Sequence, residues 1–137
     1  MAKIISMSQL GNELTKAINS AEIEMKAKAN KAIRKAAIKT WSKIIRMTPV
    51  DTGRARGNWF IGLSVDSDIN TSDNVRGSQY VNDKLPNNVL NDKVYLYNNL
   101  PYIGALEFGH SSQAPNGMVR ISLLGWPGEL KKAFKEV

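Results

Sequence analysis

Apolar residues recur every three or four positions along the first third of the chain. The apolar stripe consists of Leu10, Leu14, Ile18, Ala21, Met25, Ala29, Ile33, Ala36, Ala37, Trp41, Ile44 and Ile45. Steps of three and four place side chains on one face of an α-helix. Ser6 or Ser8 can cap such a helix, and Pro49 disfavours helical backbone at Thr48. The pattern therefore predicts one helix from near Gln9 to the residue before Thr48.

This predicted helix is unusually long. No glycine or proline interrupts the chain between Asn12 and Thr48. A helix of ~38 residues is ~57 Å long at 1.5 Å per residue, which exceeds the diameter of a small domain. We therefore expect it to bend, to break near Asn19-Ser20 or Asn30, or to project towards other subunits. Its apolar stripe is more typical of a packing surface than of a ligand site.

The segment from residue 48 to residue 59 concentrates residues that redirect the chain. Those residues are Pro49, Asp51, Thr52, Gly53, Arg54 and Arg56. Asp and Thr side chains bond to nearby backbone N–H groups, and glycine adopts positive φ without strain. We interpret the segment as a rigid joint between the helix and the rest of the chain. Residues 53–57 have a second interpretation, a loop that wraps a phosphate, but the turn is favoured.

Beyond the joint, the apolar period changes from that of a helix to that of strands. Asn58–Val65 and Lys93–Asn98 alternate as strands do, and Met118–Leu124 is a third strand candidate. A short C-terminal helix, Gly128–Glu136, follows Pro127, which suits a first helical position. Asp66–Asp92 is rich in Asp and Asn, so we expect a long extended loop that orders against a neighbouring molecule.

Together these elements predict one α+β domain over residues 1–137. It consists of a long N-terminal helix, a small antiparallel sheet with a long polar loop, and a short C-terminal helix. Tyr80-Val81 and Val89-Leu90 are the residues expected to anchor the loop locally. The chain divides at the joint into a basic helical segment, residues 1–47, and a body that holds the sheet and the C-terminal helix, residues 48–137.

Charge is distributed unevenly between these two parts. The net charge is +7. Residues 1–47 hold ten Lys or Arg and three Glu, whereas residues 48–137 hold nine basic and nine acidic residues, so the helical segment carries the whole excess. Such a helix suits an acidic partner, namely nucleic acid, an acidic protein surface or anionic lipid; a solvated lysine face is the alternative. The candidate partner-facing residues are Lys26, Lys28, Lys31, Arg34, Lys35, Lys39 and Lys43.

The residue inventory excludes several kinds of chemistry. The chain has no cysteine and one histidine, His110, which excludes disulfides, thiol nucleophiles, histidine triads and His-rich metal sites. We therefore expect no enzyme activity, cofactor or metal. No apolar run is long enough for a membrane span or a signal peptide, so a soluble protein without a membrane partner is expected. Glu107 stands between Leu106 and Phe108, and a half-buried carboxylate needs a cation; Arg54 and Arg56 are the candidates.

Two boxes of residues, taken in order, resemble a known family. Pro49-Val-Asp-Thr-Gly-Arg54 is followed by an Asn-Trp strand, then by Pro101-Tyr-Ile…Leu-Glu-Phe-Gly109, and finally by a proline-containing loop and a segment with Arg120. This set resembles the tail-completion (tail-terminator and head–tail joining) family of tailed bacteriophages, over about residues 10–137. The resemblance implies a first box of Pro49, Asp51, Thr52, Gly53 and Arg54. It implies a second box of Tyr102, Glu107, Phe108 and Gly109.

The resemblance also implies a function. Its members are non-catalytic virion proteins that are assembled in the host cytoplasm and form a ring in the neck or at the end of the tail. A homo-oligomeric ring is implied here, with a hexamer favoured over a dodecamer, between the phage connector and tail proteins and with genomic DNA in its lumen. The chain departs from the family pattern in its long Asp66–Asp92 loop and in Asn98-Asn-Leu before Pro101. The rival hypotheses are a nucleic-acid-binding module that uses the basic helix and a small enzyme centred on Glu107.

Overall fold

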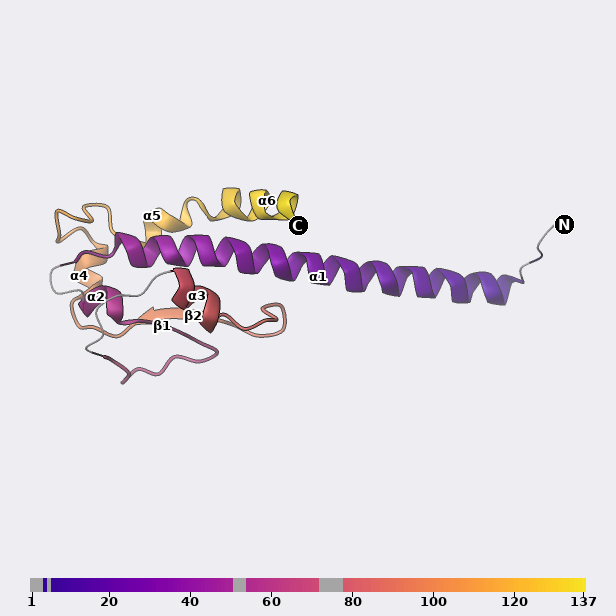
Figure 1. Ribbon diagram of the computed structural model, residues 1–137, viewed down its shortest axis with the longest axis horizontal. Coiled ribbons are helices and arrows are strands. Elements are labelled where there is room, and N and C mark those ends of the chain that lie inside the picture. Colours follow the sequence, from indigo (N-terminus) through magenta and orange to yellow (C-terminus); the bar gives the residue numbers. More distant parts are fainter. Residues whose placement is uncertain (1–3, 5, 51–53, 72–77) are drawn as a thin grey trace.

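A single long helix runs the length of the molecule, and the remaining elements gather around its C-terminal half (Figure 1). The computed structural model describes residues 4, 6–50, 54–71 and 78–137. The elements are α1 (Met7–Met47), α2 (Arg54–Gly57), β1 (Trp59–Gly62), α3 (Ser78–Lys84), β2 (Tyr95–Asn98), α4 (Ile103–Glu107), α5 (Val119–Leu123) and α6 (Trp126–Glu136). The predicted α+β class is confirmed, with a long N-terminal helix, a small antiparallel sheet and a short C-terminal helix.

Helix α1 starts and stops where the sequence predicts. The Ser6 hydroxyl accepts the backbone N–H of Gln9 at 3.1 Å, and the Gln9 side chain accepts that of Ser6 at 2.9 Å. This reciprocal capping box satisfies two N–H groups that have no partner inside the helix. Of the expected bend, break or projection, the structure shows projection, because the 41 residues form one unbroken helix. Contact with other subunits stays a prediction.

The sheet is a two-stranded antiparallel ribbon with Trp59 opposite Asn98 and Gly62 opposite Tyr95. Both strands are shorter than predicted. The third strand predicted at Met118–Leu124 is wrong, because residues 119–123 form helix α5. Apolar alternation over so few residues does not distinguish a strand from a short helix.

The long extended loop predicted at residues 66–92 is also wrong in part. It contains helix α3, whose Val81 is fully buried, and Val89 packs on the same core. The anchors expected at Tyr80, Val81 and Val89 are therefore confirmed, whereas Leu90 is exposed and the expectation for it is wrong. The segment packs on α1 of its own chain, because the Asn30 side chain donates to the Asn87 carbonyl at 2.6 Å and accepts the Val89 N–H at 2.8 Å.

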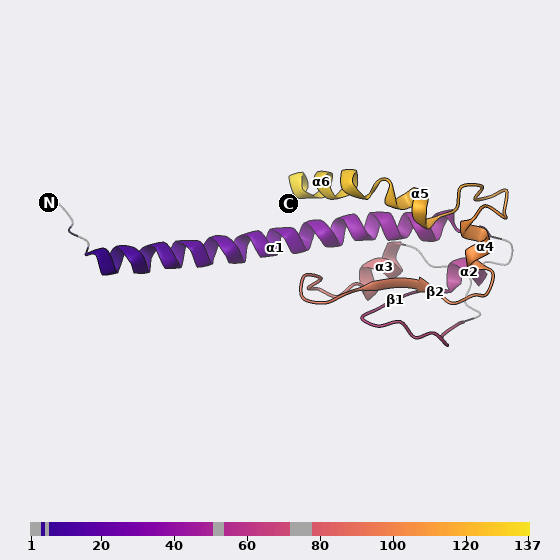
Figure 2. The same cartoon turned by 180° about the vertical axis from the view of Figure 1, so that it is seen from behind.

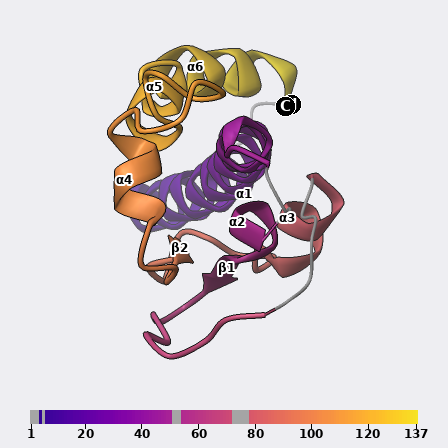
Figure 3. The same ribbon diagram turned by 90° about the vertical axis from the view of Figure 1, so that its left-hand side faces the viewer.

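The core surrounds the second half of α1. Seen along the helix, α5 and α6 cover one side while α2, α3 and the sheet cover the other (Figure 3). Ile44 and Ile45 are buried against Trp59, Val81 and Met118. A second cluster joins α1 to α6 through the small residues Ala32, Ala36 and Ala133.

The first half of α1 extends beyond the body, as the reverse view also shows (Figure 2). We call residues 7–28 the arm; every residue in it is exposed. Leu10, Leu14, Ile18 and Met25 are 45–63% exposed. The apolar stripe predicted from the sequence is thus core in its second half and exposed in its first half.

Candidate assembly site

The joint between α1 and the sheet is built around the side chain of Thr48. Thr48 is fully buried; its hydroxyl donates to the Ile44 carbonyl at 2.8 Å and accepts the Trp59 indole N–H at 2.9 Å. The Thr48 hydroxyl oxygen therefore bonds both to the last turn of α1 and to Trp59, the first residue of β1. Pro49 beside Thr48 is buried. The structure thus describes the end of α1 before the predicted joint and the start of α2 after it. Asp51, Thr52 and Gly53 themselves lie outside the described residues.

Arg56 reinforces the joint from the side of α2. Its guanidinium donates to the backbone carbonyl of Thr48 at 2.8 Å and to that of Arg46. Both carbonyls lie at the C-terminal end of α1, where such groups lack partners within the helix and a cation is favourable. Arg54 is the exposed first residue of α2. Arg56 thus caps the C-terminal end of α1.

Glu107, at the end of α4, caps the following helix. One carboxylate oxygen accepts the N–H groups of Met118 at 2.9 Å and Val119 at 2.8 Å; the other accepts the backbone N–H of Arg120 at 3.0 Å. These are the first N–H groups of α5, which have no partner inside that helix. The cap explains why residues 119–123 are helical rather than extended.

The cation beside Glu107 is Arg120, so the predicted pairing with Arg54 or Arg56 is wrong. The Arg120 guanidinium lies 3.1 Å from the carboxylate and donates to the Glu107 backbone carbonyl at 3.0 Å. Burial acts to raise the pKa of Glu107. The N–H groups of Arg120, Val119 and Met118, together with the Arg120 side chain, outweigh that effect and lower the pKa. Glu107 is therefore held as a carboxylate, half-buried as predicted.

Two glycines make this tight arrangement sterically feasible. Gly117 has φ of 80°, and a Cβ there would lie 2.1 Å from the Glu107 carbonyl oxygen. Gly109 of the second box has φ of 88°, and its Cβ would lie 2.5 Å from the Pro115 carbonyl oxygen. At either position any residue other than glycine would be strained, because the backbone has positive φ and a Cβ would meet a backbone oxygen. Gly109 of the second box thus permits the tight loop after which the chain returns to Glu107.

The two boxes are linked through that same loop. The Gln113 side chain accepts the Val50 N–H at 2.8 Å and donates to the Val50 carbonyl at 3.0 Å. Val50 stands between Pro49 and Asp51 of the first box, and Gln113 follows the second box. The structure therefore brings the described parts of both boxes to one end of the molecule, at the C-terminal end of α1 (Figure 1).

An exposed hollow opens at this end. Phe108, Pro115, Arg120, Ile121 and Leu124 line it together with Asn116, and we call this surface the box face. Phe108 is 68% and Leu124 81% exposed. The Arg120 guanidinium lies 4.5 Å from the centre of the Phe108 ring, within cation–π distance. Tyr102, the remaining box residue, is exposed just before α4.

The basic residues of α1 do not form one unpaired surface. Arg34 donates to the Pro86 carbonyl at 2.9 Å and reaches the Leu85 and Asn82 carbonyls at the end of α3. Lys35 pairs with Glu136 and Lys39 with Glu129, both on α6.

The remaining predicted basic residues lie in different surroundings. Lys26 pairs with Glu22 of the previous turn at 2.9 Å. Lys28 and Lys31 are exposed, and Lys43 lines a hollow next to α6. Much of the predicted partner-facing charge therefore connects α1 to its own body.

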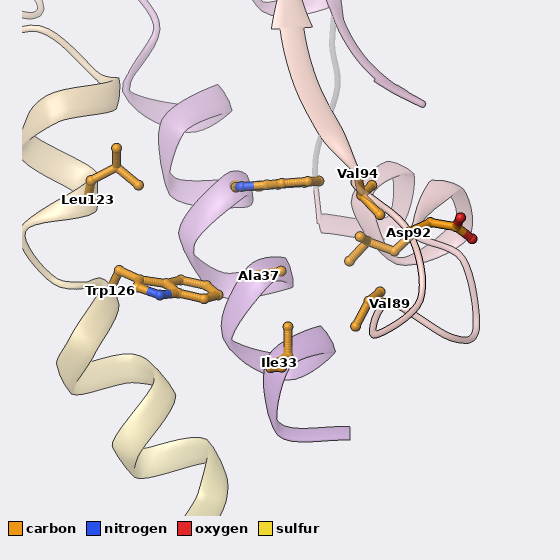
Figure 4. A pocket seen from close by; sticks show the side chains of 9 residues that line it. Ile33, Ala37, Val89, Asp92, Val94, Leu123 and Trp126 are labelled. Carbon is orange, nitrogen blue, oxygen red and sulfur yellow. The ribbon is translucent and has the colours of Figure 1, made fainter. Parts of the chain in front are cut away.

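A second cavity, of about 280 Å³, lies against the buried half of α1 (Figure 4). Its lining residues are Ile33, Ala37, Trp41, Leu85, Val89, Asp92, Val94, Leu123 and Trp126. Asp92 is the only charged one, and its carboxylate points away from α1. The other described residues that line this cavity are apolar.

Two further observations concern metals and membranes. The described residues contain no group of three or more His, Cys, Asp or Glu side chains placed to hold a metal ion. Among the helices of the described chain, none has the length and apolarity that crossing a bilayer requires.

Sequence reasoning missed Gln113 and the role of Arg120. Arg120 was noted only as part of the family pattern, within a predicted strand. The available signal was the Pro-Asn-Gly turn at 115–117, which allows residues 118–120 to return to Glu107. Asn58 was also missed: its side chain donates to the carbonyls of Arg54 and Thr71 and accepts the Thr71 N–H.

Comparison with known proteins adds no relative. No family model, no curated protein and no solved structure matches this chain. The resemblance to tail-completion proteins therefore depends on the two sequence boxes.

Proposed function

We propose that this chain is a non-enzymatic structural virion protein that forms a ring in the phage neck or at the end of the tail. In that place it joins the head connector to the tail. The observation that carries the proposal is the box face, because Phe108 of the second box and Arg120 of the family pattern lie together on this exposed surface, next to the cap that Glu107 forms. Glu107 forms that cap with three backbone N–H groups and one guanidinium.

The composition of the box face suits contact with protein. Large exposed apolar side chains next to an arginine are typical of the residues that dominate protein interfaces. Phe108 and Leu124 are among the most exposed large apolar side chains of the body. In a ring, each subunit presents this face to a different surface of its neighbour, and the contact closes when the rotation permits. A hexamer is the favoured closure.

The rival hypothesis, a nucleic-acid-binding module, finds less support. Nucleic-acid binding requires cations that can reach phosphates. Three of the seven candidate residues, Arg34, Lys35 and Lys39, already contact carbonyls or carboxylates of the body. DNA in the lumen of a ring remains compatible with the cations that stay exposed.

Ring formation tests the proposal. The purified protein, alone and mixed with the products of the adjacent genes, is examined by mass photometry and negative-stain electron microscopy. We expect closed rings of one stoichiometry. Leu124→Asp should prevent ring closure because it buries a charge in the contact. Leu63→Asp is the matched control, since Leu63 is 57% exposed at the end of β1, away from the hollow.

Two outcomes contradict the proposal. One is the absence of rings in every mixture. The other is equal ring formation by the Leu124 and Leu63 variants, which would remove the box face from the contact. Steeply salt-dependent binding of duplex DNA by the monomer would instead favour the nucleic-acid-binding module.

A further inference from the structure

The hollow next to α6 has a wall of basic and hydroxyl side chains. It has a volume of about 350 Å³ and lies on the half of α1 that α6 and α3 flank (Figure 3). Its lining residues are Ile38, Lys39, Ser42, Lys43, Arg46, Ser78 and Glu129, and we call it the cationic hollow. The three cations follow each other in steps of four and three, which places them on one face of α1.

Two of these cations have no partner in the part of the chain that the structure describes. The Lys43 ammonium and the Arg46 guanidinium make no hydrogen bond or ion pair there. The third cation, Lys39, has one long ion pair, with its Nζ 3.7 Å from a carboxylate oxygen of Glu129. Three cations against one carboxylate leave an excess of two positive charges in the cationic hollow. Such an excess attracts anions.

Two buried polar atoms of the cationic hollow lack a hydrogen-bond partner among the described residues. One is the hydroxyl of Ser42, which is 9% exposed, and the other is Oε2 of Glu129. A third such atom, the Thr40 hydroxyl, belongs to a residue that does not line the hollow. Buried polar groups in native structures nearly always have partners. A favourable helix dipole accounts for a cation in the last turn of α1, but it does not account for these two atoms.

We propose that the cationic hollow binds a phosphate that carries a P–OH group, either free phosphate or a phosphate monoester. Lys43 and Arg46 donate to its charged oxygens, because ammonium and guanidinium groups form strong hydrogen bonds with phosphate. The Ser42 hydroxyl donates to a further oxygen. The P–OH group donates to Oε2 of Glu129. One ligand of this kind therefore gives a partner to both unpaired cations and to both buried polar atoms.

Glu129 decides which oxyanions fit the cationic hollow. A carboxylate accepts hydrogen bonds but donates none. Sulfate and phosphate diesters carry no proton at neutral pH, so each would place an acceptor against the acceptor of Glu129 at the cost of an unpaired buried group. Phosphate monoesters have a second pKa of about 6 and keep a protonated fraction at neutral pH. The backbone of DNA consists of diesters, so this site is distinct from the nucleic-acid-binding hypothesis.

Calorimetric titration of the full chain with inorganic phosphate and with sulfate, at equal ionic strength in chloride buffer, tests the role of Glu129. We expect phosphate to bind at least about tenfold more tightly, which is the contribution of one hydrogen bond to a charged group. Glu129→Gln should abolish this preference, because the glutamine amide donates to either anion. Glu136→Gln is the matched control and should keep it. Glu136 also pairs with a lysine of α1, Lys35, but does not line the hollow.

Two further pairs of variants test the donors. Ser42→Ala should weaken phosphate binding by at least about fivefold, the contribution of one hydrogen bond. Thr40→Val removes the buried hydroxyl outside the hollow and should leave the affinity unchanged. Lys43→Gln should weaken binding by at least about tenfold. Lys31→Gln makes the same change of charge at an exposed position outside the hollow and should have little effect. Far-UV circular dichroism verifies that all four variants are folded.

Methyl phosphate and dimethyl phosphate identify the source of the phosphate. If methyl phosphate binds as tightly as inorganic phosphate, the ligand is a phosphate monoester on a larger molecule; if it binds more weakly, the ligand is free phosphate. Dimethyl phosphate should bind at least about tenfold more weakly than either. Three results would overturn the inference: no binding of either protonated phosphate at millimolar concentrations, equal affinity for phosphate and sulfate or dimethyl phosphate, or equal effects of Lys43→Gln and Lys31→Gln. The site lies within one chain, so none of these results bears on the ring assay.

Discussion

At the scale of single residues, Glu107 shows what sequence reasoning could and could not reach. A carboxylate between two apolar residues predicts partial burial and a cation, and both are present. The identity of the cation could not be predicted. It depends on a reversal at Gly117 that brings Arg120 back over α4, and only the three-dimensional path of the chain shows that reversal. The pairing with the joint arginines was wrong for this reason.

Replacement of Glu107 should destabilise the body. Glu107→Ala leaves three N–H groups of α5 without acceptors, and we expect a loss of about 2 kcal/mol in the free energy of unfolding. Urea denaturation measures it. Arg120→Ala should lose less than about 1 kcal/mol, because the Arg120 side chain is 59% exposed. Equal losses in the two variants would contradict the capping role.

The same carboxylate should make stability depend on pH. Its pKa is lower in the folded protein than the ordinary value of 4.5. Its contribution is therefore present above pH 4.5 and is lost as the pH falls through the lower, folded value. We expect the stability difference between the parent and Glu107→Gln to be constant above about pH 5 and to shrink on acidification. A difference that grows towards low pH would contradict this account.

Gly117 offers a matched pair of substitutions with Gly104. Gly117→Ala should cost at least about 2 kcal/mol, because an L-residue at positive φ is strained and its Cβ meets a backbone oxygen. Gly104 lies inside α4, and a Cβ there meets nothing within 4 Å. Gly104→Ala should therefore be neutral or stabilise by up to about 1 kcal/mol. Thermal unfolding of both variants checks the contrast.

At the scale of elements, a helix with a long repeated apolar pattern was easier to predict from the sequence than a short helix. Helix α1 repeats its stripe many times and carries capping signals at both ends, so its bounds were predictable to within a few residues. Helix α5 has five residues and depends on a cap from Glu107. Helix α3 depends on Val81 reaching the core and on Arg34 binding the carbonyls at its end. Such short elements are fixed by distant contacts rather than by local pattern.

The joint between α1 and β1 should be sensitive to the loss of one hydroxyl. Thr48→Val keeps the shape of the side chain but leaves the buried Trp59 N–H without an acceptor. We expect a loss of about 1–3 kcal/mol. Thr15→Val is the matched control: the Thr15 hydroxyl bonds to the Gly11 carbonyl on the exposed arm. That control should change the stability of the body by no more than about 0.5 kcal/mol.

At the scale of the whole molecule, the division into an arm and a body was not predictable. The apolar stripe has the same spacing along all of α1, and nothing in that spacing shows where the body stops covering it. Coverage is set by where α6 ends, near Ala32, and by where Asn30 binds the segment at 87–89. Both depend on how the later parts of the chain fold back onto α1. The sequence did predict that a helix this long could project.

Removal of the arm should leave the body folded. A protein that begins at Ala29 keeps every described contact between α1 and the body, including those of Asn30 and Arg34. We expect its melting temperature to be within about 2 °C of that of the full-length chain. Its far-UV circular dichroism should show fewer helical residues. A large fall in melting temperature would mean that the arm stabilises the body.

The projecting helix also governs how the protein moves through solution. A helix of 41 residues is about 60 Å long, whereas a compact body of ~100 residues has a radius of gyration of ~13 Å. The frictional coefficient of the monomer must therefore exceed that of a sphere of equal mass. On a gel-filtration column calibrated with globular standards, the 15.2 kDa chain will elute early and imitate a larger species. Only methods that measure mass directly, such as light scattering or sedimentation equilibrium, will count its subunits correctly.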